Sequence, residues 1–585
     1  MINMKNYKKV YAAFILAGGL ILHGCNGIFD DLAINPNQPS MGAYFTSPSA
    51  VNDAVMTMYG YMSTQRCLGA SGSKTTIIRS DEASSNSDYG KPGMFGADLN
   101  ASYYTIEQPY TLMYTTASQA SYIIETAPSV DFSGNEELRN AYIGEAYFWR
   151  AFAHYYLLIN FRNISPIRQM PRNGDDYVRP LEKPAAVWDF IQEDLAHAKE
   201  LLPVKGYWDS KNAGRVTKAS AAALLGKAYL YRSGIEQYYG EDKTTFYSEA
   251  AKEFGDVIDG KYGTYDLTKN YADNFDVAHE NNEESILEFQ FLGDVDNAGF
   301  NPGLATSGLA FDSRGLMLPG AGVGYEGVVH NWLYNAFVNS VDKDGYTDIR
   351  MFSTMIFNDL DASIHLRNDA GGNPVRLEGP GGYKWEELYP AKNGKEGFAT
   401  VSNPLAHSFK AGIRKGIDCS MPTQTEADGT PKLVGVGAGV KEYVYNQPRA
   451  HGVNWRYIRY ADVLMMYAEA IVSGGTQASN MTPLQAVNKV RGRVNMSELP
   501  SVTMTDIQNE RILEFALEGH RFYDLLRWGK LASRFTELQE SDPNFKKFIS
   551  ADDFKGFVTN KHEWLPIPIN EVNSNPYITE NNPGY

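Results

Sequence analysis

The sequence predicts a mainly α-helical fold that is interrupted by a long, loop-rich middle. Apolar residues recur at helical spacing in two blocks, about 51–260 and 455–535. The stretch between them, about 290–450, is rich in Gly, Asp and Asn, which favours loops and short strands. In the first block, alanine and aromatic positions alternate as in antiparallel helix pairs. This pattern favours a superhelix like that of tetratricopeptide repeats, although no regular 34-residue period is visible.

The N-terminus has the order of features expected of an export signal. Lysines at positions 5, 8 and 9 precede an apolar run over 10–22, which is too short to span a bilayer comfortably. The run ends in Leu22-His23-Gly24-Cys25, which resembles a bacterial lipobox. We therefore expect a signal peptide over 1–24 and a lipidated Cys25 at the start of a mature chain, 25–585. An ordinary cleaved signal with an incidental cysteine remains the alternative.

The net charge excludes some classes of partner, and the cysteine content indicates how the fold is stabilised. The 585-residue chain has a formal net charge of −16, which argues against nucleic acid and anionic lipid surfaces as partners. Only Cys67 and Cys419 remain besides Cys25, so the fold does not depend on a disulfide framework. Whether these two cysteines pair is left open by the sequence.

The first block contains six segments with a helical pattern, each bounded by turn residues. Pro184 and Pro203 punctuate the fourth of them, one in its first turn and one just past its end. The expected helices are 51–62, 110–125, 138–161, 183–202, 219–231 and 246–258. A frame of this kind buries its large aromatic residues, so we expect four tryptophans in the core: Trp149, Trp188, Trp455 and Trp528.

The stretch 509–530 reads as two helices broken at a glycine. Thr505 and Gln508 have the spacing of a capping box, which predicts a helix that begins near Asp506. Gly519 can supply the left-handed residue that ends this helix, and Gly529 can end the next one in the same way.

Charged residues in this stretch predict a network of ion pairs. Three glutamates share one face of the first helix, namely Glu510, Glu514 and Glu518. On the second helix, Arg521 and Arg527 lie three residues to either side of Asp524. The alternative is a pair of catalytic carboxylates like that of a glycosidase. Nearby arginines would keep the carboxylates ionised, whereas a general acid needs a raised pKa, so we favour the structural network.

Four motifs carry a resemblance to a known family. They are the stretch 509–530, the segment Arg459-Tyr460-Ala461-Asp462-Val463-Leu464-Met465-Met466-Tyr467-Ala468-Glu469-Ala470, the turn Leu565-Pro566-Ile567-Pro568, and the terminal Asn581-Asn582-Pro583-Gly584-Tyr585. Together they resemble the C-terminal signature of the SusD/RagB family of outer-membrane nutrient-binding lipoproteins. The resemblance implies one family domain over 25–585 with a tetratricopeptide-like helical fold.

The same resemblance implies a function. We expect a cell-surface lipoprotein of the outer membrane that captures oligosaccharide and passes it to a SusC-like TonB-dependent transporter, acting as the lid of that barrel. The resemblance implies neither catalysis nor a cofactor. A peptide-uptake receptor of the same family remains open, as does a secreted glycoside hydrolase, whose carboxylates carry no local motif.

Family members that bind starch-like glycans stack them on aromatic residues from two loops. The first loop follows Ser80-Asp81-Glu82 and contains Tyr89; the second spans Gly320 to Gly327, contains Tyr325, and precedes the turn Asp348-Ile349-Arg350. Phe300 and Trp385 are further aromatic candidates, and Arg79 and Asp81 are candidates for hydrogen bonds to hydroxyls. A tyrosine in a glycine-rich loop can also be a packed plug, so both interpretations stand.

Motifs for dinucleotide binding, zinc binding and serine hydrolysis are either absent or lack the sequence context that they require. Gly322 to Gly327 satisfies the G-x-G-x-x-G pattern, but residues 316–320 make a poor preceding strand for a dinucleotide site. The histidines and cysteines lack zinc spacing, and no G-x-S-x-G is present. We therefore predict no metal site and no catalytic residues.

Overall fold

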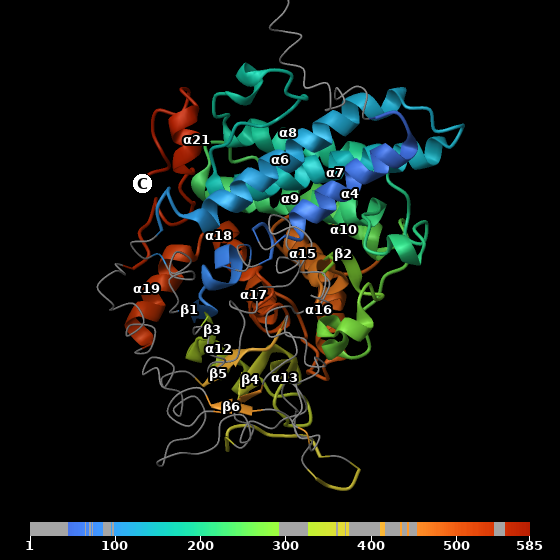
Figure 1. Cartoon of the computed structure of the whole chain (residues 1–585). Coiled ribbons are helices and arrows are strands. Elements are labelled where there is room, and N and C mark those ends of the chain that lie inside the picture. Colours follow the sequence, from blue (N-terminus) through green and yellow to red (C-terminus); the bar gives the residue numbers. More distant parts are fainter. Residues whose placement is uncertain are drawn as a thin grey trace, which may run out of the picture.

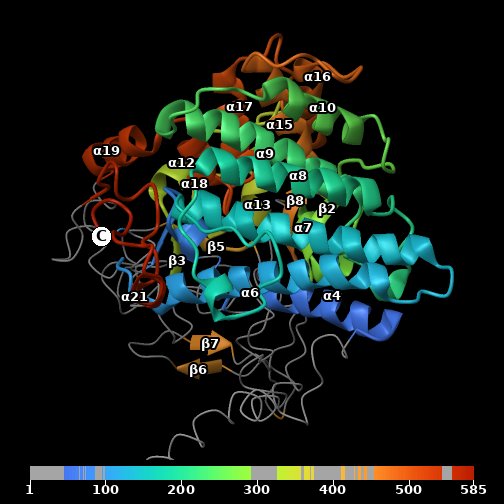
Figure 2. The same cartoon turned by 90° about the horizontal axis from the view of Figure 1, so that it is seen from above.

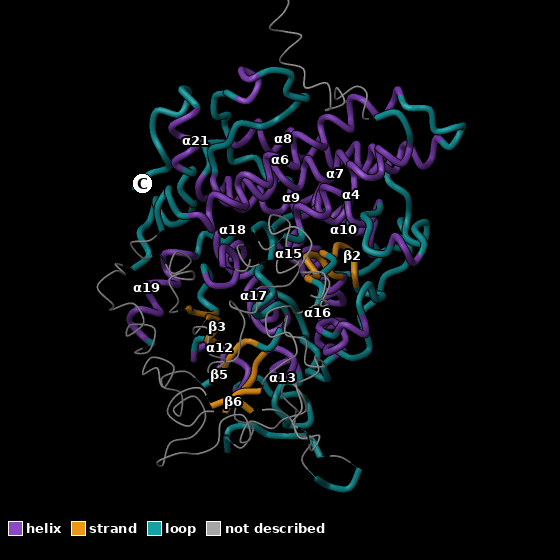
Figure 3. Tube along the Cα trace, in the orientation of Figure 1, coloured by secondary structure: helices purple, strands orange, loops and turns teal. Residues whose placement is uncertain are grey.

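The computed structural model places a thick helical layer over a small β-sheet, with a second group of helices between them (Figure 1). It describes residues 45–64, 66–69, 72, 74–85, 95, 99–291, 326–357, 361–368, 370–373, 410–415, 427, 433–435, 441–443, 453–542 and 556–585. Tube colouring by secondary structure separates the two regions, since helices fill the upper part and most strands lie in the lower part (Figure 3).

The upper layer is built by the first helical block. Each helix packs against the next along the chain, from α4 to α9 and on to α10, so the layer grows by successive neighbours (Figure 2). Its helices are α4 (Pro48–Met62), α6 (Tyr104–Thr126), α7 (Glu136–Phe161), α8 (Pro184–Leu201), α9 (Lys218–Tyr239) and α10 (Tyr247–Ile258). This arrangement confirms the predicted tetratricopeptide-like superhelix.

The second helical block continues the layer and then turns toward the sheet. Helix α15 packs on α10 and α16 packs on α15, so the superhelix carries on across the long middle insertion. The block comprises α15 (Tyr460–Val472), α16 (Pro483–Arg493), α17 (Met504–Glu514), α18 (Arg521–Arg527) and α19 (Leu531–Ser541), followed near the C-terminus by α21 (Ile569–Ser574).

The strands in the described part of the chain are short and form three small sheets. One sheet has the order β1-β3-β5-β4, with β1 (Ala83–Ser85), β3 (Glu326–Val329), β4 (Met355–Phe357) and β5 (Ala411–Ile413). The short helices α12 (Asn331–Val338) and α13 (Arg350–Thr354) lie in the connection from β3 to β4. The other two sheets are pairs: β2 (Ser285–Phe289) with β8 (Trp455–Arg459), and β6 (Leu433–Gly435) with β7 (Lys441–Tyr443).

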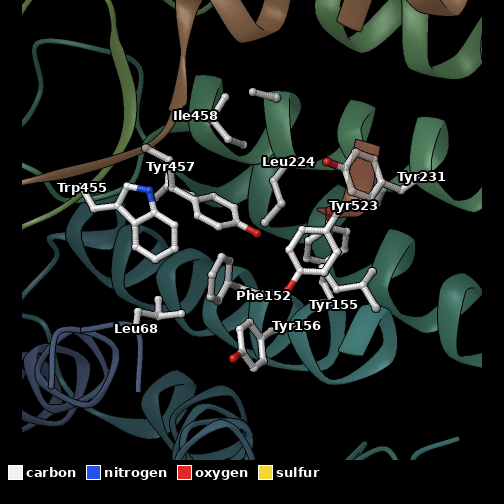
Figure 4. Packing of buried hydrophobic residues seen from close by; sticks show 14 of the residues in the cluster. Leu68, Phe152, Tyr155, Tyr156, Leu224, Tyr231, Trp455, Tyr457, Ile458 and Tyr523 are labelled. Atoms are coloured by element: carbon white, nitrogen blue, oxygen red, sulfur yellow. The ribbon is translucent and has the colours of Figure 1, made fainter. Parts of the chain in front are cut away.

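An aromatic core joins the upper layer to β8 and α18 (Figure 4). Phe152 of α7 meets Tyr457 of β8 edge-to-face at 5.2 Å between ring centroids, and Tyr457 meets Trp455 at 5.5 Å. Edge-to-face contacts of this kind add about 0.5–1.5 kcal/mol per pair beyond burial of area. The four tryptophans assigned to the core are all buried, which confirms that prediction: Trp149, Trp188, Trp455 and Trp528.

Helix boundaries differ from the expectations in a few places. The helix expected to begin near Asp506 starts two residues earlier, because Thr503, not Thr505, makes the capping box with Asp506. That helix ends at Glu514, so Glu518 lies in the following turn, where Leu517 and Gly519 both adopt positive φ. Among the described helices, none combines the length and apolar content needed to cross a bilayer.

Candidate functional site

The antiparallel pairing of β1 with β3 brings the bases of the two predicted ligand loops together. Ala83 pairs with Val329, and Ser85 pairs with Glu326. Tyr325 directly precedes Glu326, and Tyr89 follows Ser85 by four residues. The two loops, about 240 residues apart in sequence, therefore join the sheet at the same end of two neighbouring strands.

Five of the predicted functional residues lie outside the described residues: Cys25, Tyr89, Phe300, Tyr325 and Trp385. Their roles stay predictions. Cys419 also lies outside the described part, while Cys67 is a buried free thiol whose pKa is raised by burial.

Arg79 has a structural role in place of the predicted hydrogen bonds to ligand hydroxyls. Its side chain is fully buried, stacks at 4.0 Å over the ring of Phe522, and donates to the backbone oxygens of His562 and Glu563 at 3.1 and 2.9 Å. It also donates to Asn160 Oδ1 at 3.2 Å. Arg79 therefore fastens the turn before β1 to the C-terminal segment and does not reach a ligand at the surface.

Asp81 likewise has a structural role in place of the predicted hydrogen bonds to ligand hydroxyls. Its fully buried carboxylate accepts hydrogen bonds from Arg521 at 2.9 and 3.1 Å and from Arg534 at 2.7 Å. The Trp332 ring lies beside both guanidinium groups, 4.2 Å from that of Arg534. Burial alone would raise the pKa of Asp81, but the two arginines outweigh burial and hold it below its ordinary value.

Glu82 completes the anchor of β1. One carboxyl oxygen accepts from Leu517 N at 2.9 Å and the other from Ser80 Oγ at 3.2 Å. Burial raises the pKa of Glu82 to about 8, although the Leu517 amide and the nearby Arg521 oppose the shift. The Leu517 amide belongs to the turn between α17 and α18, so Glu82 ties the sheet to that turn.

Strand β4 is tethered to the same region through Arg350. This guanidinium, fully buried, contacts Glu510 Oε1 at 2.5 Å and Glu514 Oε2 at 3.0 Å on α17. Asp348 pairs with it from the other side at 2.7 Å. The turn Asp348-Ile349-Arg350 is thus an ion-pair bridge between α13 and α17.

Strand β5 carries the third tether. Lys415, two residues after the strand, donates to Ala516 O at 2.8 Å, to Glu518 Oε1 at 2.9 Å and to Tyr271 at 2.6 Å. Burial lowers the pKa of Lys415 to about 8, although Glu518 opposes the shift. Three strands of the sheet are therefore held by charged residues that meet one segment, 510–521, which we call the anchor segment.

The glutamates and arginines of the anchor segment take part in the ion-pair network that the sequence predicts. Arg459 bridges Glu514 and Glu518 at 2.6 and 2.9 Å, and Arg511 binds Asp524 at 2.8 Å. One partner differs from the expectation: Arg521 pairs with Asp81, whereas Asp524 pairs with Arg511 and Arg527. The pKa of Glu514 lies far below its ordinary value, because its three arginine neighbours outweigh burial.

Two arrangements near the sheet superficially resemble catalytic groups. Asp81 and Glu82 are adjacent carboxyls whose pKa values move in opposite directions, as in glycosidases. Ser84 Oγ also contacts His330 Nε2, while His330 Nδ1 lies 2.7 Å from the backbone oxygen of Asp81. All four side chains are at most 3 % exposed, so a substrate bond cannot approach them.

The partners of the anchor segment could not be found from spacing alone. Arg350, Lys415 and Asp81 are 101 to 440 residues from their partners in sequence, and each looks like an ordinary loop charge. The available signal was the excess of glutamates on one face of 510–518, which requires cations from somewhere.

Comparison with known proteins decides the family. The family model described as "SusD family" matches residues 425–585, and the model described as "Starch-binding associating with outer membrane" matches residues 34–230. A SusD-like protein of Bacteroides ovatus is 25% identical over 533 residues, which cover 90% of this chain and 83% of the relative. The chain belongs to the SusD/RagB family.

Solved SusD-like structures share the fold. A SusD superfamily protein from Bacteroides vulgatus aligns with a TM-score of 0.66 and 22% identity, over 93% of this chain and all of that one. A laminarin-binding SusD-like protein aligns with a TM-score of 0.61 and 23% identity, over 92% of this chain and 100% of that one. The helical superhelix described above is therefore the SusD fold.

Proposed function

We propose that this SusD/RagB protein is a cell-surface lipoprotein that binds oligosaccharide and delivers it to a TonB-dependent outer-membrane transporter, acting as the transporter's lid. Family membership supports the class, and a structural neighbour described as laminarin-binding supports a glycan as the ligand. The protein binds without cleaving, because the dense carboxylate cluster is paired with arginines and buried.

The observation that carries the proposal is the pairing of Ser85 with Glu326. This pairing joins the loops that contain Tyr89 and Tyr325 to the same end of the β1–β3 pair, so two aromatic side chains can serve one ligand. Phe300 and Trp385 are proposed to contribute further ring faces. Sugar rings stack on aromatic faces, and burial of such a face makes a large apolar contribution to binding.

The rigid tethers of the sheet support the same proposal. A binding site loses affinity when its loops must be ordered on binding, so a fixed base lowers that cost. Asp81, Arg350 and Lys415 fix three strands to the anchor segment through buried ion pairs. The loops are thereby presented from a preorganised sheet.

A screen of purified polysaccharides tests the ligand class. Laminarin, starch, xyloglucan, mannan and a peptide mixture are titrated into the protein, and reducing ends are measured after long incubation. We expect micromolar to millimolar binding of one glycan without release of reducing ends. Binding of the peptide mixture alone would favour the peptide receptor, and steady sugar release would favour the hydrolase.

Localisation is tested separately. We propose that Cys25 is lipidated and holds the mature chain, 25–585, at the outer membrane. Cys25→Ala, expressed without the partner transporter, should move the protein from the membrane fraction to the soluble fraction. Cys67→Ala is the matched control, and it should stay with the membrane. Membrane association of Cys25→Ala equal to wild type contradicts the anchor.

A further inference from the structure

A groove of about 290 Å³ lies between α6 and α21, on the helical side of the molecule and away from the β1-β3-β5-β4 sheet (Figure 1). Tyr110, Thr111 and Tyr114 of α6 line one wall, and Glu571 of α21 lines the other. Arg179, from the connection between α7 and α8, also lines it. The volume is at the lower end of the range of small-molecule pockets.

The walls of the groove are held in place by hydrogen bonds that cross it at its margins. Asn570 donates to Glu107 across the groove, and Ile569 N donates to Ala101 O at 2.8 Å. Asn575 donates both to Arg179 O at 2.8 Å and to Glu571 Oε1 at 3.0 Å. The groove is thus preformed, which lowers the cost of binding.

The charges in the groove select against simple ions. Glu107 and Glu571 line it together with Arg179. Within the described part of the chain, the Arg179 guanidinium forms no ion pair or hydrogen bond, so its donors are available. An anion would meet two carboxylates, and a metal cation would meet the guanidinium. A neutral molecule that carries both donors and acceptors suits all three groups.

Ring faces and hydroxyls complete the chemistry. The rings of Tyr110 and Tyr114 lie 4.8 Å apart at 55°, and Tyr114 is oriented by a hydrogen bond that it accepts from Ser165 N at 3.1 Å. Thr111 and Ser118 add hydroxyl groups along α6. Tyr110 is buried, so the partly buried ring of Tyr114 is the one that can contact a ligand. Beside a carboxylate, a guanidinium and hydroxyls, this ring matches a pyranose ring, which has apolar faces and a polar edge.

We propose that this groove is a second carbohydrate subsite that binds one or two neutral sugar rings, remote from the sheet loops. It rests on the proposed function in that the ligand is a glycan. In this arrangement the vicinal hydroxyls of the sugar bind Arg179 and Glu571, and a ring face packs on Tyr114. A long glycan held at the sheet loops could contact the protein a second time here.

Hydrogen–deuterium exchange localises binding without depending on the sheet loops. Maltose, cellobiose, laminaribiose, xylobiose and mannobiose are each added at millimolar concentration, and glycylglycine is added as a zwitterionic probe. We expect at least one disaccharide to slow exchange in 107–118 and 569–574, both in the wild type and in Tyr325→Ala/Trp385→Ala. Retention in that double variant separates this subsite from the proposed loop site.

Two variants test the assignment within the groove. Thr111→Trp fills the groove from the exposed face of α6, and Thr57→Trp places the same ring at an exposed threonine of α4 as a control. Arg179→Met removes the donors and keeps the stem. We expect Thr111→Trp to abolish the protection and Arg179→Met to weaken disaccharide binding about tenfold, with Thr57→Trp unchanged.

Three results would overturn the subsite: no protection of either segment by any of the five disaccharides, protection that survives Thr111→Trp, or protection by glycylglycine alone. The last outcome assigns the groove to peptide termini. If the subsite fails while the polysaccharide screen succeeds, the proposed function stands without it. If no polysaccharide binds in the screen while the groove binds a disaccharide, the proposed site at the sheet loops is contradicted and the groove subsite stands.

Discussion

Asp81 and Arg521 form a buried, two-pronged ion pair across 440 residues of sequence, with Nε–Oδ1 and Nη2–Oδ2 distances of 2.9 and 3.1 Å. Asp81 lies two residues before β1, and Arg521 is the first residue of α18. This contact therefore joins the sheet that carries the proposed ligand loops to the helices that cross the centre of the fold.

Breaking this pair on one side should be costly. Asp81→Ala leaves Arg521 and Arg534 without their shared carboxylate, and removal of one partner from a buried pair typically costs about 3–5 kcal/mol. Denaturant unfolding of the single and double variants with Arg521→Met measures the coupling. The exposed pair Arg139–Glu136 is the control, and its removal should cost at most about 1 kcal/mol. Equal losses at both pairs would contradict the assigned role.

Asp524 should serve stability and leave binding unchanged. Burial raises its pKa, but Arg511 and Arg527 outweigh burial and lower the pKa to about 2. Because the folded-state pKa is below the ordinary 3.8, its contribution is present above about pH 4 and is lost as pH falls through 2.

The corresponding measurement compares the wild type with Asp524→Asn. The difference in free energy of unfolding should be largest near neutral pH and should shrink between pH 4 and pH 2, by roughly 2 kcal/mol. Glycan affinity of the folded variant should stay near wild type. An unchanged melt combined with lost binding would instead place Asp524 in the binding site.

Glu82 should give the opposite pH dependence. Its pKa of about 8 means that the folded protein keeps a proton on this carboxyl between pH 4.5 and pH 8, while the unfolded chain releases it. The free energy of unfolding therefore falls as pH rises through this window. Glu82→Gln keeps an oxygen that can accept from Leu517 N and cannot ionise.

Unfolding curves at pH 5.5, 7 and 8.5 check this prediction. Glu82→Gln should gain stability relative to wild type as pH rises, and the gain should level off above pH 8. Lys415 also titrates near pH 8, but it is present in both proteins and cancels in the difference. A difference that is constant across the three pH values would contradict a protonated Glu82.

Local patterns in the sequence predicted these helices well because the helical spacing of apolar residues and the bounding turn residues lie within each helix's own span. The helix expected at 138–161 is α7 (Glu136–Phe161), and that expected at 183–202 is α8 (Pro184–Leu201). The boundary of α17 was misplaced because two threonines, Thr503 and Thr505, both offer a plausible cap, and only backbone geometry selects the first.

The candidate site was predicted less completely, for a physical reason. The carboxylate stripe at 510–518 indicated that cations were needed, but it could not indicate that Arg350, Arg459 and Lys415 supply them. Arg79 and Asp81 were expected near the ligand because they lie at the segment Ser80-Asp81-Glu82, which precedes the first expected ligand loop. Here the turn is covered by α18, α19 and the C-terminal segment. Both side chains are buried and bind these elements, so they stabilise the fold and do not contact a ligand.

Calorimetry with the glycan selected by the screen tests the central claim most directly. Tyr89→Ala, Tyr325→Ala and Trp385→Ala are compared with wild type and with Tyr238→Ala, a control at an exposed tyrosine of α9. Removal of one stacking ring should cost about 1–3 kcal/mol, a roughly 5- to 150-fold loss of affinity, in at least one loop variant, with Tyr238→Ala unchanged. If all three loop variants are folded and bind the glycan as tightly as wild type, the proposed ligand site is contradicted.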